Sequence, residues 1–306
     1  MSSNQFLTII TSPPNEILNV FNFIISFGLV ILMFYLGLKI NFSNFKKNFV
    51  EPKSLLIGLF IQIILIPVFA LIYISATNFL FNIQLGIMII ACMPSAATSN
   101  YITSKINGDL PLSITLTSFC TLFSVLSIPF YLKLFSLITT QDVSILNFDY
   151  SNLIIKVFTF ITLPILIGAT LKYYLPQIIK IEKNLDRISL VLFVVIMKLA
   201  IYLSIINIQN PSETFIAVFV FMIILITLVS FILKLSNSSL KITKTLYTEA
   251  LLQNNALGFM IVFSISANSS GLLPILAMYA LGQYIMIVLL LFILFKSKLF
   301  ISSEKI

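Results

Sequence analysis

Nine long apolar stretches run through this chain, and they restrict the folds it can adopt. With boundaries good to a few residues, they cover 18–40, 54–76, 85–106, 112–138, 153–173, 188–206, 215–233, 245–266 and 273–295. Each is close to the ~20 residues that an α-helix needs to cross the hydrocarbon core of a bilayer. A transmembrane β-barrel would instead show short segments of alternating hydrophobicity. The sequence therefore predicts an all-α polytopic membrane protein with nine transmembrane helices.

Composition excludes several other classes of protein. Charged residues make up 9% of the chain and hydrophobic residues 59%, whereas about a quarter of a soluble domain is charged. A soluble globule, a disordered chain and a nucleic-acid-binding protein are therefore not expected. The sequence contains no histidine, which removes the Ser-His-Asp and Cys-His catalytic arrangements. The apolar stretches also contain no pair of aspartates, so we do not expect an enzyme.

The basic residues indicate how the chain is oriented in the membrane. Fifteen of the 18 lie on alternate connections, all on one side, and the opposite side has only Lys133 and Lys156. The last one, Lys198, lies inside the sixth stretch. Because cytoplasmic connections are enriched in lysine and arginine, the N-terminus is predicted outside and the C-terminus in the cytoplasm. We expect the membrane to be a bacterial cytoplasmic (inner) membrane, and the net charge of +8 to reflect topology.

Two of the apolar stretches are interrupted by polar residues. The third is polar over 94–104, where Pro94 removes an amide donor, and the eighth is polar over 249–255. Backbone can unwind inside a bilayer only where protein or a water-filled cavity satisfies its amides and carbonyls. A pair of interrupted helices at matching positions in two halves is typical of the binding site of a secondary transporter.

The order of the stretches predicts an inverted repeat within a single transmembrane domain, 1–306. One half covers about 16–139 and the other about 186–298, and the extra span 153–173 links them. The two halves begin on opposite sides of the membrane, and the interrupted helix is third in each. Such discontinuous helices bring helix N-termini and free carbonyls close to the bilayer midplane. The N-termini favour anions there, and the carbonyls favour cations.

Glu249 is the only acidic residue deep in any apolar stretch. An unpaired carboxylate there is costly, and the apolar stretch 245–266 around it contains no lysine or arginine. Na⁺ is an economical partner because hard cations favour the oxygen ligands that both interrupted segments supply. Two alternatives stay open, namely that Glu249 carries a proton or only hydrogen-bonds helices together. The serine, threonine and asparagine residues of these segments could likewise be interhelical contacts.

At these residues the chain resembles the bile acid:sodium symporter family over nearly its whole length, as a nine-span, bacterial-type member. The segments that carry the resemblance are FYLGLKINFSNF (34–45), IGLFIQIILIP (57–67), CMPSAATSN (92–100) with NGDLPLSITLT (107–117), and TEALLQNNALG (248–258). The resemblance implies two coupling sodium ions bridged by the second crossover glutamate. The first ion would use Ser99, Asn100, Ser113, Thr117 and Glu249, and the second Gln62, Glu249, Gln253 and the main-chain carbonyls of Ala250 and Leu252.

The resemblance also implies where the substrate binds. An organic anion would lie at the crossover, near Thr98 and Asn254. The chain departs from the family here, because the family's Pro-Gly-Gly is Pro94-Ser95-Ala96. Lys198 is a further candidate, since it stands roughly 15 Å from each end of its helix and could meet a substrate carboxylate. The alternative for Lys198 is a side chain that extends to the interface.

We therefore expect a secondary active transporter that couples sodium to the symport of a small organic anion by alternating access. Spans two to four and seven to nine would form a core that moves against a panel of spans one, five and six. Its partners would be the anion, sodium ions and the bilayer, with no nucleic acid and no obligate protein partner. The alternatives are an auxin-efflux-like carrier with proton coupling or outward transport, an arsenite exporter that uses Cys92, and a passive channel.

Overall fold

The computed structural model describes residues 15–40, 52–139, 150–175, 210–265 and 269–296, with isolated positions between 177 and 202. Within these ranges all regular secondary structure is helical, apart from one isolated bridge between Ser95 and Gln253. The helices are α2 (Asn15–Lys39), α4 (Pro52–Leu59), η1 (Phe60–Leu65), α5 (Ile66–Ser75), α6 (Phe81–Cys92), α7 (Ala97–Lys105), α8 (Leu110–Ile138), α9 (Tyr150–Val157), η3 (Phe158–Thr162), α10 (Leu163–Tyr174), α12 (Pro211–Ser236), α13 (Leu240–Leu251), α14 (Asn255–Ile265), η5 (Ser269–Leu272) and α15 (Leu273–Lys296).

Five helical segments of this set are long and apolar enough to cross a membrane, by length and composition. They are Pro52–Ser75, Leu110–Ile138, Tyr150–Tyr174, Pro211–Ser236 and Leu273–Phe292. These segments coincide with the predicted spans two, four, five, seven and nine, and they identify an integral membrane protein. The predicted sixth span, 188–206, lies largely outside the described residues.

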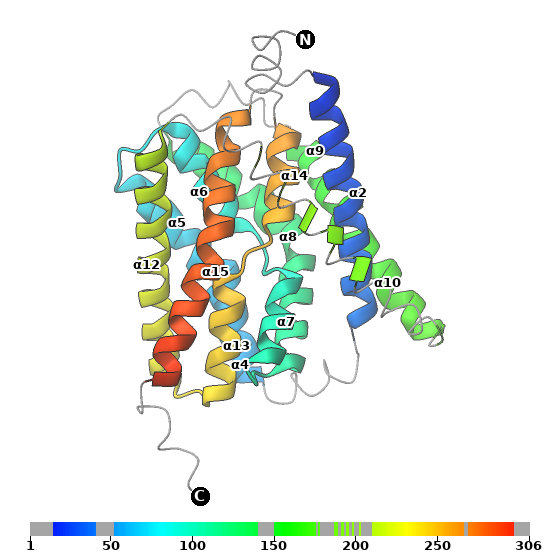
Figure 1. The fold of residues 1–306 in the computed structure, drawn as a ribbon, viewed down its shortest axis with the longest axis vertical. Helices are drawn as coiled ribbons and strands as arrows, with labels where there is room; N and C mark the ends of the chain where they lie inside the picture. The colour runs from blue at the N-terminus through cyan, green and yellow to red at the C-terminus, as the bar shows by residue number, and fades with distance from the viewer. Residues whose placement is uncertain are drawn as a thin grey trace, which may run out of the picture.

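Two helices break in the middle of the bundle, as the sequence predicts. α6 and α7 follow one another from top to bottom in Figure 1, whereas α13 lies below α14. The breaks are shorter than the predicted 94–104 and 249–255, because only residues 93–96 and 252–254 leave the helix. Residues 97–104 stay helical, since other helices contact most of their polar side chains, namely those of Thr98, Ser99, Asn100 and Thr103. A polar side chain at membrane depth therefore did not require an unwound backbone.

The two breaks satisfy each other's backbone. The Ala96 amide donates to the Leu252 carbonyl (2.8 Å), and the Asn254 amide donates to the Pro94 carbonyl (2.9 Å). Buried amides and carbonyls without partners are strongly disfavoured, above all in lipid. This short antiparallel pairing therefore fixes the two breaks side by side at the crossing point.

Prolines explain the two π-helical segments. η1 precedes Pro67 and η3 precedes Pro164, each in the first turn of the following α-helix. A proline in a helix clashes with the carbonyl four residues earlier and cannot donate to it, and widened turns commonly absorb this conflict. For Pro67 that carbonyl belongs to Ile63, and the Tyr131 hydroxyl donates to it (2.8 Å). The widened η1 turn carries Gln62, one of the residues predicted to bind the second sodium ion.

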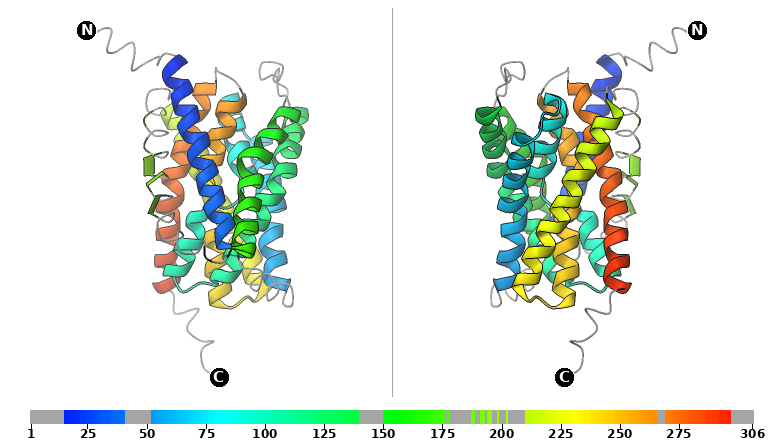
Figure 2. Two further views of the ribbon diagram at one scale, coloured as in Figure 1. Left: turned by 90° about the vertical axis from the view of Figure 1, so that its right-hand side faces the viewer. Right: turned by 90° about the vertical axis from the view of Figure 1, so that its left-hand side faces the viewer.

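Helices α2 and α10 pack directly against each other beside the rest of the bundle, as the left view of Figure 2 shows. Glycines permit this approach. A Cβ atom on Gly37 would overlap the Ile165 carbonyl oxygen, and one on Gly168 would overlap the Phe34 carbonyl oxygen. Small residues at such crossings let helix backbones approach closely in membranes.

We expect Gly168→Ala to destabilise the protein, because the added methyl group meets backbone that cannot rotate away. Overpacking of this kind costs about 1–3 kcal/mol, although alanine is the better helix former by about 1 kcal/mol. The measurement is thermal unfolding of the purified protein in detergent. Gly282→Ala is the matched control, since the atom closest to its added Cβ would be the Met222 side-chain sulfur at 3.1 Å, and no backbone atom is among its nearest neighbours. Equal melting temperatures for the two variants would contradict the proposed close crossing.

Candidate functional site

The centre of the site is the carboxylate of Glu249, in the last turn of α13 and 4% exposed. Four hydroxyl groups from three other segments donate to it. Its Oε1 accepts from Ser99 (2.6 Å) and Ser113, and its Oε2 accepts from Ser95 (2.5 Å) and Thr117 (2.9 Å). Each carboxylate oxygen therefore has its own pair of hydroxyl groups.

An amide oxygen completes this cluster. The Asn100 carbonyl oxygen lies 2.8 Å from the Ser113 hydroxyl oxygen and 3.4 Å from that of Thr117, while the Asn100 amide nitrogen is buried without a hydrogen-bond partner. Among the described residues, Lys241 pairs with Asp109 (3.8 Å), and no basic side chain pairs with Glu249. The cluster thus gathers one formal negative charge and five uncharged oxygen donors or acceptors in a buried space.

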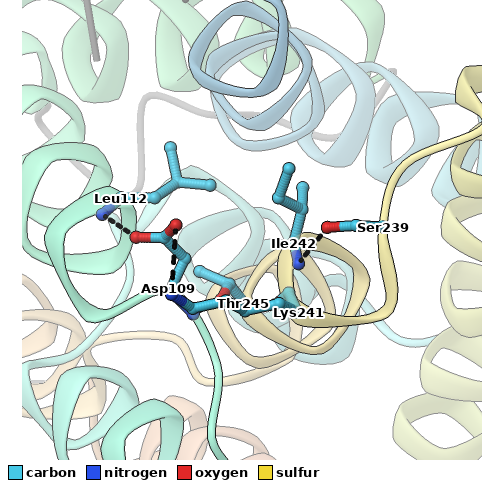
Figure 3. Close-up of polar contacts among 6 residues, drawn as sticks. All are labelled: Asp109, Leu112, Ser239, Lys241, Ile242 and Thr245. Atoms are coloured by element: carbon cyan, nitrogen blue, oxygen red, sulfur yellow. Dashed lines mark hydrogen bonds and ion pairs between the residues drawn. The ribbon is translucent and has the colours of Figure 1, made fainter. Parts of the chain in front are cut away.

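Helices α8 and α13 contact each other through polar residues that are four apart within each helix. Because residues four apart lie on the same face, successive contacts are one helical turn apart. The lowest contact is drawn in Figure 3, where the Asp109 amide donates to the Thr245 hydroxyl (2.7 Å). One turn further along both helices, Ser113 donates to Glu249. A second turn along α8, Thr117 also reaches Glu249. The spacing in sequence therefore determines which hydroxyl groups face the carboxylate.

The starts of both helices are capped, which fixes the register of these contacts. The Asp109 carboxylate accepts from the Leu112 amide (3.1 Å) at the start of α8, and the Ser239 hydroxyl accepts from the Ile242 amide (3.4 Å) at the start of α13 (Figure 3). Side-chain caps of this kind satisfy amides that have no partner within the helix. Lys241, one turn before Thr245, adds its ion pair with Asp109.

We expect Thr245→Val to lower the stability of the protein by about 1 kcal/mol or more, because the partly buried Asp109 amide loses its acceptor. Thermal unfolding measures the effect. Thr227→Val is the matched control, since Thr227 also bonds a carbonyl of its own helix (2.9 Å) but is exposed on α12. A change no larger than that of the control would show that the Asp109–Thr245 contact does not stabilise the α8–α13 pair.

A second polar group surrounds Gln62, which is 6% exposed in η1. Its amide nitrogen donates to the Met93 carbonyl (2.8 Å) and to the Gln253 side-chain oxygen (2.7 Å). Gln253 in turn donates to the Ala250 carbonyl (2.9 Å), and its backbone amide donates to Gln283 on α15 (3.0 Å). This group joins both breaks to α15.

The side-chain oxygen of Gln62 is buried and accepts no hydrogen bond. A buried acceptor without a partner is costly, so a water or a cation is the expected partner. A hollow of about 10 Å³ lies beside Gln62, lined also by Cys92, Pro94 and Cys120. That volume is comparable with a single water-sized sphere. The oxygen-rich donor set of both groups suits a hard cation such as Na⁺.

Two of the three residues predicted to bind substrate, Thr98 and Asn254, lie at the starts of the second half-helices. Thr98, in the first turn of α7, is partly buried and accepts from the Tyr284 hydroxyl (3.4 Å). Asn254 is buried, and its side-chain oxygen accepts from the Leu257 amide (3.2 Å) at the start of α14. Both helices thus direct their N-termini, which carry partial positive charge, toward the crossing.

Comparison with known proteins identifies the family. The sequence profile of the Sodium Bile acid symporter family matches residues 26–211, well over half of the chain. The chain belongs to this family. The matched range includes Gln62 and the first break with its hydroxyl groups, whereas Glu249 and Gln253 lie beyond it.

Several curated relatives show local similarity to this symporter-family chain. It is 25% identical over 153 residues to the probable sodium/metabolite cotransporter BASS1, chloroplastic, of Arabidopsis thaliana, covering 50% of this chain and 37% of that protein. It is 25% identical over 168 residues to the uncharacterized sodium-dependent transporter YocS of Bacillus subtilis, covering 55% and 50%. It is 31% identical over 159 residues to the hepatic sodium/bile acid cotransporter of Rattus norvegicus, covering 50% and 43%. The matches thus span half or less of the length of these relatives, and all three are named as transporters.

The structure of this family member brings the predicted cation ligands together in two groups that meet at the crossing. They are Gln62, Ser99, Asn100, Ser113, Thr117, Glu249, Ala250, Leu252 and Gln253. The carbonyls of Ala250 and Leu252 each accept one hydrogen bond and keep a second lone pair. Lys198 is exposed and takes part in neither group.

Sequence reasoning missed three residues of the site, namely Ser95, Gln283 and Tyr284. Gln283 is 1% exposed within an apolar helix, and a lone amide at that depth could have marked it. Ser95 was predicted to be one of the polar residues of the interrupted third stretch and to replace a glycine of the family pattern, but it was not predicted to be a ligand. Its hydroxyl contact with Glu249 depends on how the two breaks cross, which no local pattern contains.

Proposed function

We propose that this protein is a secondary active transporter that couples the inward movement of Na⁺ to the uptake of a small organic anion. One observation carries the proposal, namely the buried Glu249 carboxylate, which the described residues surround with hydroxyl and amide oxygens and leave without a basic partner. A hard cation is the partner that such a set of oxygens favours. The family and the names of its relatives support the same assignment.

Two sodium ions would be carried in each cycle. The first would bind Glu249 with Ser99, Asn100, Ser113 and Thr117, and the second would bind Glu249 with Gln62, Gln253 and the carbonyls of Ala250 and Leu252. The unpartnered oxygen of Gln62 supports the second site. Two Na⁺ with a monovalent anion move one net positive charge inward. The membrane potential then contributes ~2.3 kcal/mol per 100 mV, in addition to the sodium gradient.

Nine spans in an inverted repeat are the proposed architecture, with halves of about 16–139 and 186–298. The broken helices support it, since α6 and α13 each have 12 residues and run in opposite directions (Figure 1). The end of α10 and the start of α12 also support it. They lie toward opposite ends of the bundle, which agrees with the proposed sixth span between them. The span 153–173, within α9 to α10, would be the unpaired one.

The proposed orientation places the N-terminus outside and the C-terminus in the cytoplasm of a bacterial inner membrane. Lysines end several helices that finish on the side proposed to be cytoplasmic, namely Lys39 of α2, Lys105 of α7, Lys172 of α10 and Lys234 of α12. Lys241 and Lys244 lie in the first turns of α13, which begins on that side. This distribution is the one that the positive-inside rule describes.

The substrate anion would bind at the crossing, next to Thr98 and Asn254, with Lys198 as a further contact for its carboxylate. The N-termini of α7 and α14 support this location, because aligned backbone amides favour negative charge. The core, which holds both breaks, would move against the panel formed by α2, α9–α10 and the sixth span. Such motion exposes a fixed site alternately to each side.

Transport into proteoliposomes tests this function. Purified protein is reconstituted, an inward gradient of Na⁺ or choline is imposed, and the uptake of radiolabelled 2-keto acids, hydroxy acids, sulfonates and bile acids is measured. We expect at least one anion to accumulate only with Na⁺, and a positive-inside potential to slow that uptake. Accumulation driven equally well by a proton gradient in choline would favour proton coupling and overturn the proposal.

A further inference from the structure

We propose that Ser95 is an additional ligand of the cation bound at Glu249, so that its hydroxyl group raises the affinity of this protein for Na⁺. The proposal rests on the sodium-coupled function inferred above. It adds a residue from the break between α6 and α7 to a set drawn until now from α7, α8 and α13.

The position of Ser95 is that of a ligand. Its hydroxyl donates to Glu249 Oε2 (2.5 Å) and lies 3.3 Å from the Thr117 hydroxyl, and the residue is 1% exposed. Without Ser95, Glu249 Oε2 would keep one hydroxyl partner, whereas Oε1 has two. Ser95 therefore makes the oxygen shell around the carboxylate complete on both sides.

Backbone pairing holds this hydroxyl in place. Ser95 pairs with Gln253 across the crossing, and the flanking contacts run from Ala96 to Leu252 and from Asn254 to Pro94. A short side chain on a backbone fixed from both sides loses little freedom when it binds an ion. The same pairing connects Ser95 to Gln253, the residue proposed for the second sodium ion.

A hydroxyl group can donate a hydrogen bond to Glu249 and bind a cation at the same time. A serine oxygen carries one proton and two lone pairs, so it can donate to a carboxylate and still offer a lone pair to a cation. The bond to Glu249 would thus persist when Na⁺ enters beside it. A glycine or alanine at this position supplies no such oxygen.

The test measures Na⁺ binding directly, without transport. Wild-type protein in detergent is titrated with NaCl at constant ionic strength, with choline chloride as the balancing salt, and the thermal unfolding midpoint is followed. Ser95→Ala removes the oxygen, Ser95→Gly removes the whole side chain, and Ser95→Thr keeps a hydroxyl group. Ser118→Ala is the matched control, because Ser118 is equally buried but bonds only the Ile114 carbonyl of its own helix (2.7 Å).

We expect Ser95→Ala and Ser95→Gly to raise the half-saturating Na⁺ concentration at least about fivefold, in keeping with the loss of one charge-assisted contact. Ser95→Thr and Ser118→Ala should keep the wild-type value. If one of the removal variants does not fold, the other decides the question. An unchanged half-saturation in a folded removal variant would overturn the role of Ser95 while leaving sodium coupling intact. A wild-type protein that shows no response to Na⁺ would instead refute the proposed function itself.

Discussion

Glu249→Gln should abolish both the stabilisation of the protein by Na⁺ and Na⁺-driven uptake. The amide keeps the shape of the carboxylate but removes the only negative charge of the cluster, and it also places an NH₂ group among hydroxyl groups that now donate to Oε1 and Oε2. We expect Na⁺ binding to lose about 3 kcal/mol of free energy, which corresponds to a more than 100-fold lower affinity for Na⁺. NaCl titration of the unfolding midpoint and uptake into proteoliposomes measure the two effects.

Glu213→Gln is the matched control for this variant. Glu213 lies in the first turn of α12, is partly buried, and accepts from the Leu80 amide (3.2 Å), away from the crossing. We expect it to keep the sodium response of the wild type. Equal stabilisation by Na⁺ in the wild type and in Glu249→Gln would contradict an ion site at this carboxylate.

Gln62→Leu should reduce the number of sodium ions that act together. Leucine has a similar volume but cannot ligate a cation, and it removes both the unpartnered buried oxygen and the contacts to Met93 and Gln253. If two ions bind, the Hill coefficient for Na⁺ in uptake should fall from near two toward one. The first site, which does not use Gln62, should still respond to Na⁺ in the thermal titration.

The control for Gln62 is Gln84→Leu. Gln84 lies in α6 near its start, and its amide donates to the Thr77 carbonyl (3.4 Å) in the preceding loop. This variant should keep the Hill coefficient of the wild type. A coefficient near one in the wild-type protein would argue for a single coupling ion, and the second site would then be wrong.

Much of the fold follows from the sequence, because helices in a bilayer satisfy their own backbone and must be apolar. The predicted span 112–138 lies within α8 (Leu110–Ile138), and the span 273–295 within α15 (Leu273–Lys296). The interruptions were predicted at 94–104 and 249–255, whereas the structure confines the breaks to 93–96 and 252–254. Residues 97–104 are helical although most are polar, because Ser99, Asn100 and Thr103 find their partners on α8 and α13.

The sequence is sufficient to show that the chain is an integral membrane protein and that Glu249 needs a partner, and its basic residues predict an orientation. These conclusions rest on local composition and on the cost of polar groups in hydrocarbon. Only the tertiary structure decided which oxygens surround Glu249. Ser95 and Thr117 reach the same carboxylate oxygen from segments 22 residues apart. They do so because two breaks pair through their backbones and because α8 and α13 align residues spaced by four.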